Sequence, residues 1–211
     1  MTNINQTVWR LITQDASITM SLRRDMLNIR ALALYLIKKH HLDASVDAVI
    51  SAIRRYPMEK SVAESEERLS EIFKNSIIFT KSNMACITVE ADGIRNLIAN
   101  FGEHGAHKNF RLIRGKKYTK VIVNESDLDI FKRYLKKEDI IDIKKGLGEV
   151  RIVLHEGSEN MRGILAKITG AIALHEISIS EFIMCFPDVL IYIHQKDLLR
   201  THQAVLSVQE E

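Results

Sequence analysis

Cysteine is scarce in this sequence, long apolar runs are absent, and neither charge sign is in marked excess. Two cysteines among 211 residues, with no Cys-x-x-Cys or Cys/His spacing, offer neither a disulfide framework nor a zinc site. We expect Cys86 and Cys185, which stand in apolar strand-like runs, to be buried reduced thiols in a cytoplasmic protein. No window approaches the roughly 18 apolar residues of a membrane helix, and no signal-peptide pattern opens the chain. The net charge of +3 is too small to indicate a nucleic-acid partner by itself.

Signatures of common catalytic sites are missing as well. The sequence has no GxSxG motif, no Walker phosphate loop, no HExxH metal motif and no kinase lysine signature. His104 and His107 flank a glycine, but no acidic residue at matching spacing completes a metal site. Gly146-Leu147-Gly148 is too short for a phosphate loop and predicts a turn between two units. We therefore expect a protein that is not an enzyme and has no metal or cofactor.

Residues 1–58 are predicted to form a helical domain, because apolar residues recur at helical spacing along most of it. The pattern is clearest at 28–41 and 46–56, and Pro57 ends the second helix. Two helices joined by so short a turn are typical of a helix-turn-helix, whose second helix is the recognition helix. Residues 59–76, which are charged and free of glycine, are predicted to form a connecting helix.

The candidate recognition helix carries cations that can meet DNA phosphates. The predicted nucleic-acid contacts are Ser51, Arg54, Arg55 and, just beyond the helix, Lys60. Asp47 stands at the end from which such helices usually read bases, and its charge repels phosphate. The other interpretation is a helical packing or dimerisation domain, in which the C-terminal arginines are favoured by the helix dipole.

From residue 77 the pattern changes to short strands and helices, so the rest of the chain is predicted to be α+β. Residues 77–147 have the order βαββαβ. The predicted strands are 77–79 with 84–89, 110–114, 120–123 and 140–143, and the predicted helices are 94–101 and 128–135. A turn at 115–117 makes the two middle strands a hairpin.

Residues 148–211 repeat this order without its last strand. The predicted elements are strands at 150–154, 177–185 and 189–194 and helices at 164–175 and 198–208. The clearest internal match sets VIVNESDL, residues 121–128, against IYIHQKDL, residues 191–198, at an offset of 70 residues. Three alternatives could supply the missing strand: a very short strand at the end of the unit, the strand at 77–79, or a strand from a partner chain.

The run VRIVLHEGSENMRGILAKITGAIALHEISISEFIMCF, residues 150–186, resembles the strand, polar loop and helix with which ACT domains begin. Over nearly its whole length the chain resembles archaeal ACT-domain proteins described as predicted regulators of amino acid metabolism. The matching stretches include residues 28–33, 47–56 and 111–116. The tandem units are also similar to the regulatory part of aspartate kinases. The resemblance implies a helix-turn-helix-like domain followed by two ferredoxin-like βαββαβ ACT units, at 77–147 and 148–211.

The resemblance also implies an amino-acid site at a dimer interface, in the loop after the first strand of the second unit. The residues carried over are Glu156, Ser158, Asn160, Met161, Arg162, Gly163, Ile164 and Leu165. In the family, backbone amides there hold a carboxylate, and Gly163 lets a ligand approach the backbone. Arg162 stands in place of the family's proline, and Glu156 and Glu159 make the loop acidic. The other interpretation is therefore a unit used only for dimerisation.

Two functions are expected from these patterns. In the first, a homodimer that pairs through its ACT sheets senses an amino acid, and its helical domain acts on DNA or on a protein. In the second, an accessory protein without DNA or ligand binding dimerises through its ACT units and binds a metabolic enzyme. The first unit, with Asp92-Gly93 in the equivalent loop, is expected to be more purely structural.

Overall fold

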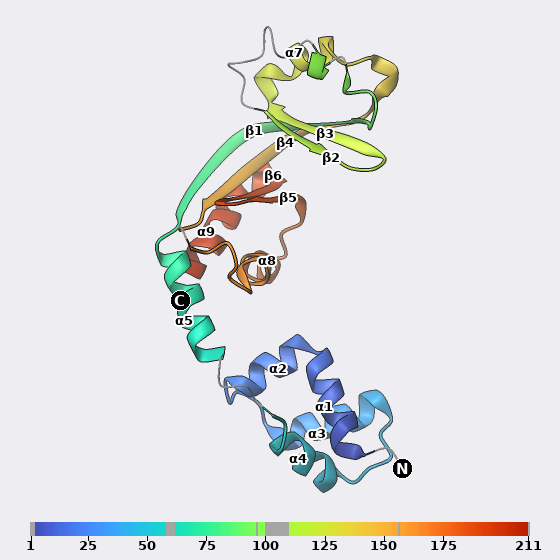
Figure 1. Cartoon of the computed structure of the whole chain (residues 1–211), viewed down its shortest axis with the longest axis vertical. Coiled ribbons are helices and arrows are strands. Elements are labelled where there is room, and N and C mark those ends of the chain that lie inside the picture. The colour runs from blue at the N-terminus through green and yellow to red at the C-terminus, as the bar shows by residue number, and fades with distance from the viewer. Residues whose placement is uncertain (1–2, 58–61, 96, 100–109, 156, 211) are drawn as a thin grey trace. The chain divides into compact units, whose positions relative to one another are not determined.

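The structure, a computed structural model, describes residues 3–57, 62–95, 97–99, 110–155 and 157–210. The chain divides into two compact units, Met1–Val62 and Ala63–Glu211, and each is described here by itself (Figure 1). The fold class is α+β as predicted, with helices first and an antiparallel sheet with helices after them.

The N-terminal unit consists of four short helices around one apolar core. They are α1 (Ile4–Gln14), α2 (Ala16–Arg23), α3 (Ile29–His40) and α4 (Val46–Arg54). Asn28 caps α3 and Ser45 caps α4 by accepting hydrogen bonds from first-turn amides. The indole of Trp9 donates to the Ala52 carbonyl at 2.8 Å and so connects α1 to α4. The predicted helix pair is therefore present as α3 and α4, joined by the short turn that ends at Ser45.

The second unit begins with α5 (Val62–Lys74), which lies within the predicted connecting helix. One side of its C-terminal part packs on the core of this unit: Phe73 is fully buried, and Leu69 and Ile72 pack against the same core. A six-stranded sheet follows in the order β2-β3-β1-β4-β6-β5. The strands are β1 (Ile77–Glu90), β2 (Arg111–Arg114), β3 (Tyr118–Asn124), β4 (Ile140–Val153), β5 (Ile179–Cys185) and β6 (Asp188–His194). The helices are α7 (Leu128–Arg133), α8 (Ile164–Leu174) and α9 (Leu198–Glu210).

In two places, a pair of strands that was predicted as separate forms one long strand in the structure. Strands 77–79 and 84–89 are both in β1, and strands 140–143 and 150–154 overlap β4, which runs through the predicted turn at 146–148. Irregular register replaces the expected breaks, and Asn83 and Gly146 there have positive φ, +55° and +67°. Side-chain oxygens accept hydrogen bonds from the backbone amides at these two positions. Gln195 Oε1 lies 2.9 Å from Asn83 N, and Glu125 Oε1 lies 2.6 Å from Gly146 N.

The two long strands are shared between the two βαββαβ repeats. Residues 77–81 of β1 pair with residues 149–153 of β4, beside β6 and β5, so the strand at 77–79 closes the second repeat. Residues 84–90 of β1 lie between β3 and the beginning of β4. We call β2, β3, α7 and the adjoining parts of β1 and β4 the first half of the sheet. The second half comprises β5, β6, α8, α9 and the other parts of β1 and β4.

Most of the change in the spacing of the repeat lies at one loop. β1 begins at Ile77 and β4 at Ile140, 63 residues later, whereas β3 begins at Tyr118 and β6 at Asp188, 70 residues later. The internal match at 121–128 and 191–198 is confirmed structurally, since each segment is a strand followed by a 3₁₀ turn and a helix. The added length lies in residues 154–163, between β4 and α8.

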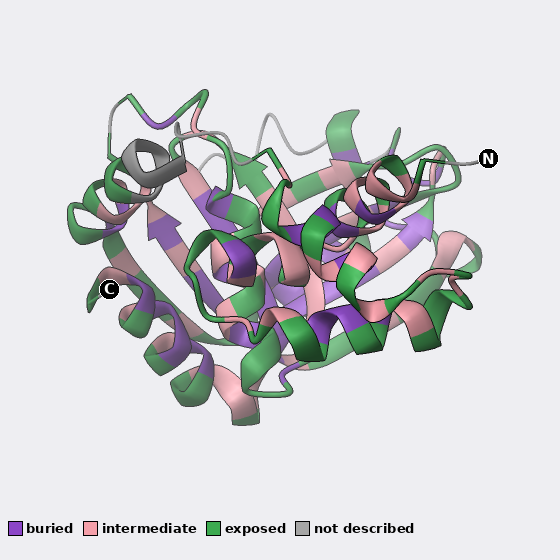
Figure 2. Cartoon of the chain, turned by 90° about the horizontal axis from the view of Figure 1, so that it is seen from below, coloured by how far each residue is buried: buried purple, intermediate pink, exposed green. Residues whose placement is uncertain are grey.

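Helices cover one face of the sheet, and the other face, on which no described helix packs, is closed by the sheet itself. In a flat sheet β3 and β5 lie four spacings apart, roughly 19 Å, yet Lys120 on β3 forms an ion pair with Glu181 on β5. The outer hairpins therefore curve toward each other over the face without helices. An apolar cluster fills the space between them: Met84, Cys86, Ile122, Leu147, Leu190 and Tyr192. Figure 2 shows purple bands on the strands, which mark buried residues.

The two cysteines differ in environment. Cys86 is buried in β1, and burial raises the pKa of its thiol, as does the nearby carboxylate of Glu181. Cys185 is exposed, so the prediction that both thiols are buried is wrong for this residue. The reason is that Cys185 ends β5, a strand at the edge of the sheet.

Candidate functional site

The predicted ligand loop connects β4 to α8 through two glycines in left-handed conformation. Gly157 has φ +90° and Gly163 has φ +92°, values that side chains with a Cβ rarely adopt. Gly163 is the N-cap of α8 and supplies no capping side chain. No described side chain therefore caps the first-turn amides of α8, which is the backbone feature that the predicted carboxylate site requires.

The predicted ligand residues divide between surface and core. Asn160, Arg162, Gly163 and Leu165 are exposed, Met161 is half-buried, Ile164 is buried, and Glu156 lies outside the described residues. Ser158 is fully buried, and its hydroxyl donates to the His155 carbonyl at 2.7 Å. Ser158 therefore stabilises the loop from inside instead of offering its hydroxyl to solvent. The exposed cation beside the α8 amides is Arg162, which forms no ion pair with another described residue.

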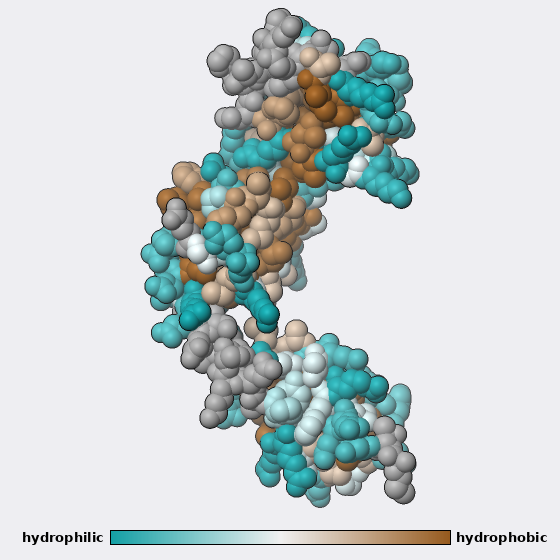
Figure 3. Space-filling model, viewed as in Figure 1, coloured by the Kyte–Doolittle hydropathy of each residue, from teal (hydrophilic) through white to brown (hydrophobic). Residues whose placement is uncertain are grey.

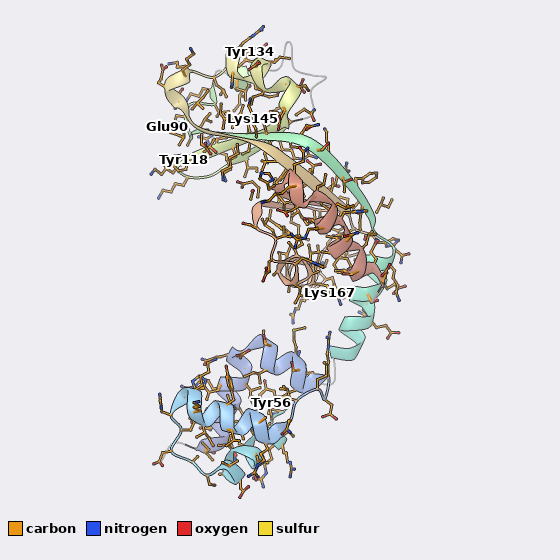
Figure 4. The ribbon with its side chains drawn as sticks, turned by 180° about the vertical axis from the view of Figure 1, so that it is seen from behind. Tyr56, Glu90, Tyr118, Tyr134, Lys145 and Lys167 are labelled. Carbon is orange, nitrogen blue, oxygen red and sulfur yellow. The ribbon has the colours of Figure 1, made fainter. Side chains whose placement is uncertain are left out.

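The equivalent loop of the first half lies beside a cavity of about 320 Å³, a size typical of small-molecule sites. Its lining residues are Glu90, Asp92, Gly93, Arg95, Lys136 and Asp139. Glu90 ends β1 next to Tyr118, its partner in the first position of β3 (Figure 4). A Cβ at Gly93 would lie 2.6 Å from the Asp139 Cβ, so the absence of a side chain allows the two segments to approach.

Charges of both signs surround this cavity. Arg95 Nη2 lies 3.1 Å from Asp92 Oδ1, and Arg114 Nη2 lies 3.9 Å from the same oxygen. Glu90, Asp139 and Lys136 form no ion pair with another described residue. Sequence reasoning missed this site, although Asp92-Gly93 after a strand was its visible signal. No sequence pattern near residues 136–139 indicates that this segment packs against the Asp92-Gly93 loop.

The predicted nucleic-acid contacts lie on the surface of the N-terminal unit. Ser51, Arg54 and Arg55 are exposed along α4, and Lys60 lies outside the described residues. The segment Met1–Val62 contains nine Lys and Arg against five Asp and Glu, a net charge of +4, which leaves −1 for the rest of the chain. The visible face of this unit is largely hydrophilic in Figure 3. The small positive charge of the protein is therefore concentrated in the helical unit.

A buried carboxylate joins the two halves of the sheet. Glu149 of β4 is 4% exposed and accepts a hydrogen bond from Arg111 Nη2 on β2 at 3.2 Å, and Arg111 Nη1 forms an ion pair with its other oxygen at 3.1 Å. The Tyr192 hydroxyl on β6 donates to it at 2.6 Å. Burial and this hydrogen bond raise the pKa of Tyr192, which stays protonated as the donor. Both oxygens of Glu149 are thus engaged in contacts that connect β4 to β2 and β6.

Neither a membrane span nor a metal cluster is found in the part of the chain that is described. No described helix combines the length and apolar character needed to cross a bilayer. Among the same residues no three His, Cys, Asp or Glu side chains gather as metal ligands. His104 and His107 lie outside the described residues.

Comparisons with known proteins show the fold. No protein-family model matches the chain, and no curated protein matches its sequence. The regulatory subunit of aspartate kinase from Thermus flavus superposes with a TM-score of 0.53 at 15% identity, over 62% of this chain and 95% of that chain. The regulatory subunit from Thermus thermophilus gives 0.50 at 14% identity, over 62% and 95%.

A whole aspartate kinase gives the same result over a smaller share of its length. The allosteric enzyme from Clostridium acetobutylicum has a TM-score of 0.53 at 17% identity, over 62% of this chain. This chain spans about a third of that enzyme's length, 34%. The described sheet and helices thus have the ACT-like fold of aspartate kinase regulatory domains.

Proposed function

We propose that this chain is an amino-acid-responsive regulatory protein without catalytic activity of its own. The observation that carries the proposal is the likeness of its fold to the regulatory subunits of aspartate kinase. Two loops in equivalent positions of that fold present groups suited to a zwitterion. Arg162 and the α8 amides favour a carboxylate. In the first half, Glu90 and Asp139 favour an ammonium group and Lys136 favours a carboxylate.

A thermal-shift screen against the twenty amino acids tests this function. Binding to the folded state raises its stability by RT ln(1 + [L]/Kd), so a ligand at about 100 times its Kd adds about 2.7 kcal/mol. Asp139→Asn and Lys136→Met each remove one charge from the first-half cavity, and Arg162→Met removes one from the second loop. Asp129→Asn and Lys132→Met are matched controls, because those residues form an ion pair on α7, away from both loops.

The expected result is a melting-temperature rise with one or a few amino acids. This rise disappears in the variants of one loop and persists in the α7 controls. Absence of any rise at millimolar concentrations contradicts sensing. That outcome favours the accessory protein that binds a metabolic enzyme through its ACT units.

DNA is the partner that we propose for the N-terminal unit, and its charge of +4 supports this choice. We expect retention on immobilised duplex DNA that falls steeply with salt. The double variant Arg54→Ala/Arg55→Ala weakens retention more than Arg10→Ala/Arg30→Ala, which removes the same charge from exposed positions of α1 and α3. Equal loss in the two variants contradicts the assignment of α4 as the recognition helix.

A homodimer through the ACT-like sheet is the assembly that we propose. β2 and β5 are the edges of the described sheet, and Leu112 and Met184 on them are 37% and 41% exposed. Unpaired strand edges favour pairing with another chain. Sedimentation equilibrium checks this assembly, and we expect Met184→Lys on β5 to shift a dimer toward monomer. A wild-type monomer across micromolar concentrations contradicts it.

A further inference from the structure

A second cleft lies on the sheet face without helices, away from the loops discussed above. Its volume is about 450 Å³, and its lining residues are Phe79, Thr80, Lys81, Phe110, Arg111, Glu149 and Arg151. We call it the β1–β4 cleft. From these residues we propose that it binds a small aromatic monocarboxylate that carries no amino group.

The floor of the cleft follows from the register of β1 and β4. Phe79 is paired with Arg151 and Lys81 with Glu149, so these four side chains project from the same face. Lys81 and Arg151 are diagonal neighbours, about 7–8 Å apart at their backbones, which is within reach of two long side chains. A single carboxylate between them can therefore contact both cations.

Charge in the cleft is positive after internal pairs are removed. Arg111 is neutralised by Glu149, whose other partner is the Tyr192 hydroxyl. Arg151 Nε donates to Asp188 Oδ1 at 2.6 Å, which leaves its two Nη groups without a hydrogen bond to another described residue. Lys81 forms no ion pair with any described residue. The five charged groups sum to one uncompensated positive charge, which favours a monoanion.

The ring of Phe79 makes the other part of the site. Phe79 is 51% exposed, and the Arg151 guanidinium lies 5.6 Å from its ring centroid. Phe110 packs its ring against Phe131 in the helix-side core, at 5.4 Å between ring centroids. Of the two lining phenylalanines, Phe79 therefore offers the apolar surface for stacking by a planar group. Because Glu149, the one carboxylate among the lining residues, is already paired with Arg111, the cleft offers no uncompensated negative charge to an ammonium group. An amino acid is therefore a poorer ligand than the corresponding carboxylic acid.

The test measures binding of 3-phenylpropionate to the full chain by isothermal titration or ligand-observed NMR. We expect a Kd of about 1 mM or below, given the small size of the ligand. We expect three comparison ligands to bind more weakly than 3-phenylpropionate. Propionate lacks the ring, phenylalanine adds an ammonium group, and 2-phenylethylamine has a cation in place of the anion.

Three variants locate the binding. Lys81→Met removes the unpaired cation and should weaken binding about tenfold. Phe79→Ala removes the exposed ring and should weaken it about fivefold. Lys144→Met is the matched control, an exposed lysine of β4 outside the cleft, and should bind as the wild type does.

No binding at about 10 mM, or equal affinity in Lys81→Met and wild type, overturns the proposal, since that concentration is far above the expected Kd. Equal binding of propionate and 3-phenylpropionate shows a site for an ion only and overturns the aromatic part. If Phe79→Ala does not fold, Lys81→Met against Lys144→Met decides the outcome.

Discussion

In the first half of the sheet, residues 91–94 connect β1 to the helical segment that follows, and in the second half residues 154–163 connect β4 to α8. The strands around these loops have the same order, but the loops present different surfaces. The short loop leaves a cavity, which Asp139 approaches from another segment. The long loop fills its own interior with Ser158 and exposes the start of a helix. Shared strands fix the framework, whereas the loops are free to acquire separate roles.

The largest effect should come from removing core side chains, which tests whether the two halves are one cooperative unit. Phe131→Ala in the first half and Ile168→Ala in the second each remove a fully buried side chain. We expect about 3–5 and about 2–5 kcal/mol of destabilisation. Because β1 and β4 belong to both halves, amides of β3 and β6 should lose hydrogen-exchange protection together in either variant.

Fluorescence of Trp9, the single tryptophan, reports separately on the helical unit and should change little in either variant. Loss of protection confined to the mutated half would show that the two halves unfold independently.

A smaller effect is expected from the buried carboxylate between the halves. Glu149→Gln leaves the partly buried Arg111 guanidinium without its charge partner and should destabilise the unit by about 2–3 kcal/mol. Urea denaturation gives this difference. The control is Asp188→Asn, which removes an ion pair whose side chains are 39% and 31% exposed and should cost about 0.5 kcal/mol. Equal costs would mean that the Glu149 contacts add nothing beyond a surface pair.

The sequence could predict the elements of each half because their signals are local. Helical spacing, the caps Asn28 and Ser45 and the repeated segments at 121–128 and 191–198 all lie within a few residues of what they specify. The continuity of β1 and β4 could not be predicted in this way. Gly146 has the local signature of a turn, and the bond that keeps it within a strand comes from Glu125, 21 residues away.

The candidate sites show the same limit. The boundaries of the second loop were predictable, since glycine and polar residues interrupt a strand and a helix. The direction of Ser158 was not, because a hydroxyl in a polar loop is compatible with either solvent or an internal carbonyl. The first-half cavity and the β1–β4 cleft each combine residues from segments distant in sequence. Their composition depends on strand register and sheet curvature, which periodicity does not specify.

The pH dependence of stability should reveal the contribution of Tyr192, which joins the halves. The folded state raises the pKa of Tyr192 above its usual value near 10, so it favours the protonated form. The stabilisation is complete below about pH 10 and is lost as pH rises, by up to about 1.4 kcal/mol per pH unit. Tyr192→Phe should remove this part of the slope in urea denaturation between about pH 9 and 11.

The smallest effect concerns the glycine that starts α8 in the long loop. Gly163→Ala places a Cβ on a residue with φ +92° and should cost about 1 kcal/mol through backbone strain, although its nearest neighbour, Leu69 Cδ2, lies at 3.4 Å. Gly170→Ala is the matched control in the same helix, where a Cβ meets nothing within 4 Å, and it should stabilise by about 0.5–1 kcal/mol. Thermal denaturation compares the two. A stabilising Gly163→Ala would mean that the loop does not hold this backbone conformation, and the helix start that the proposed carboxylate contact requires would then be absent.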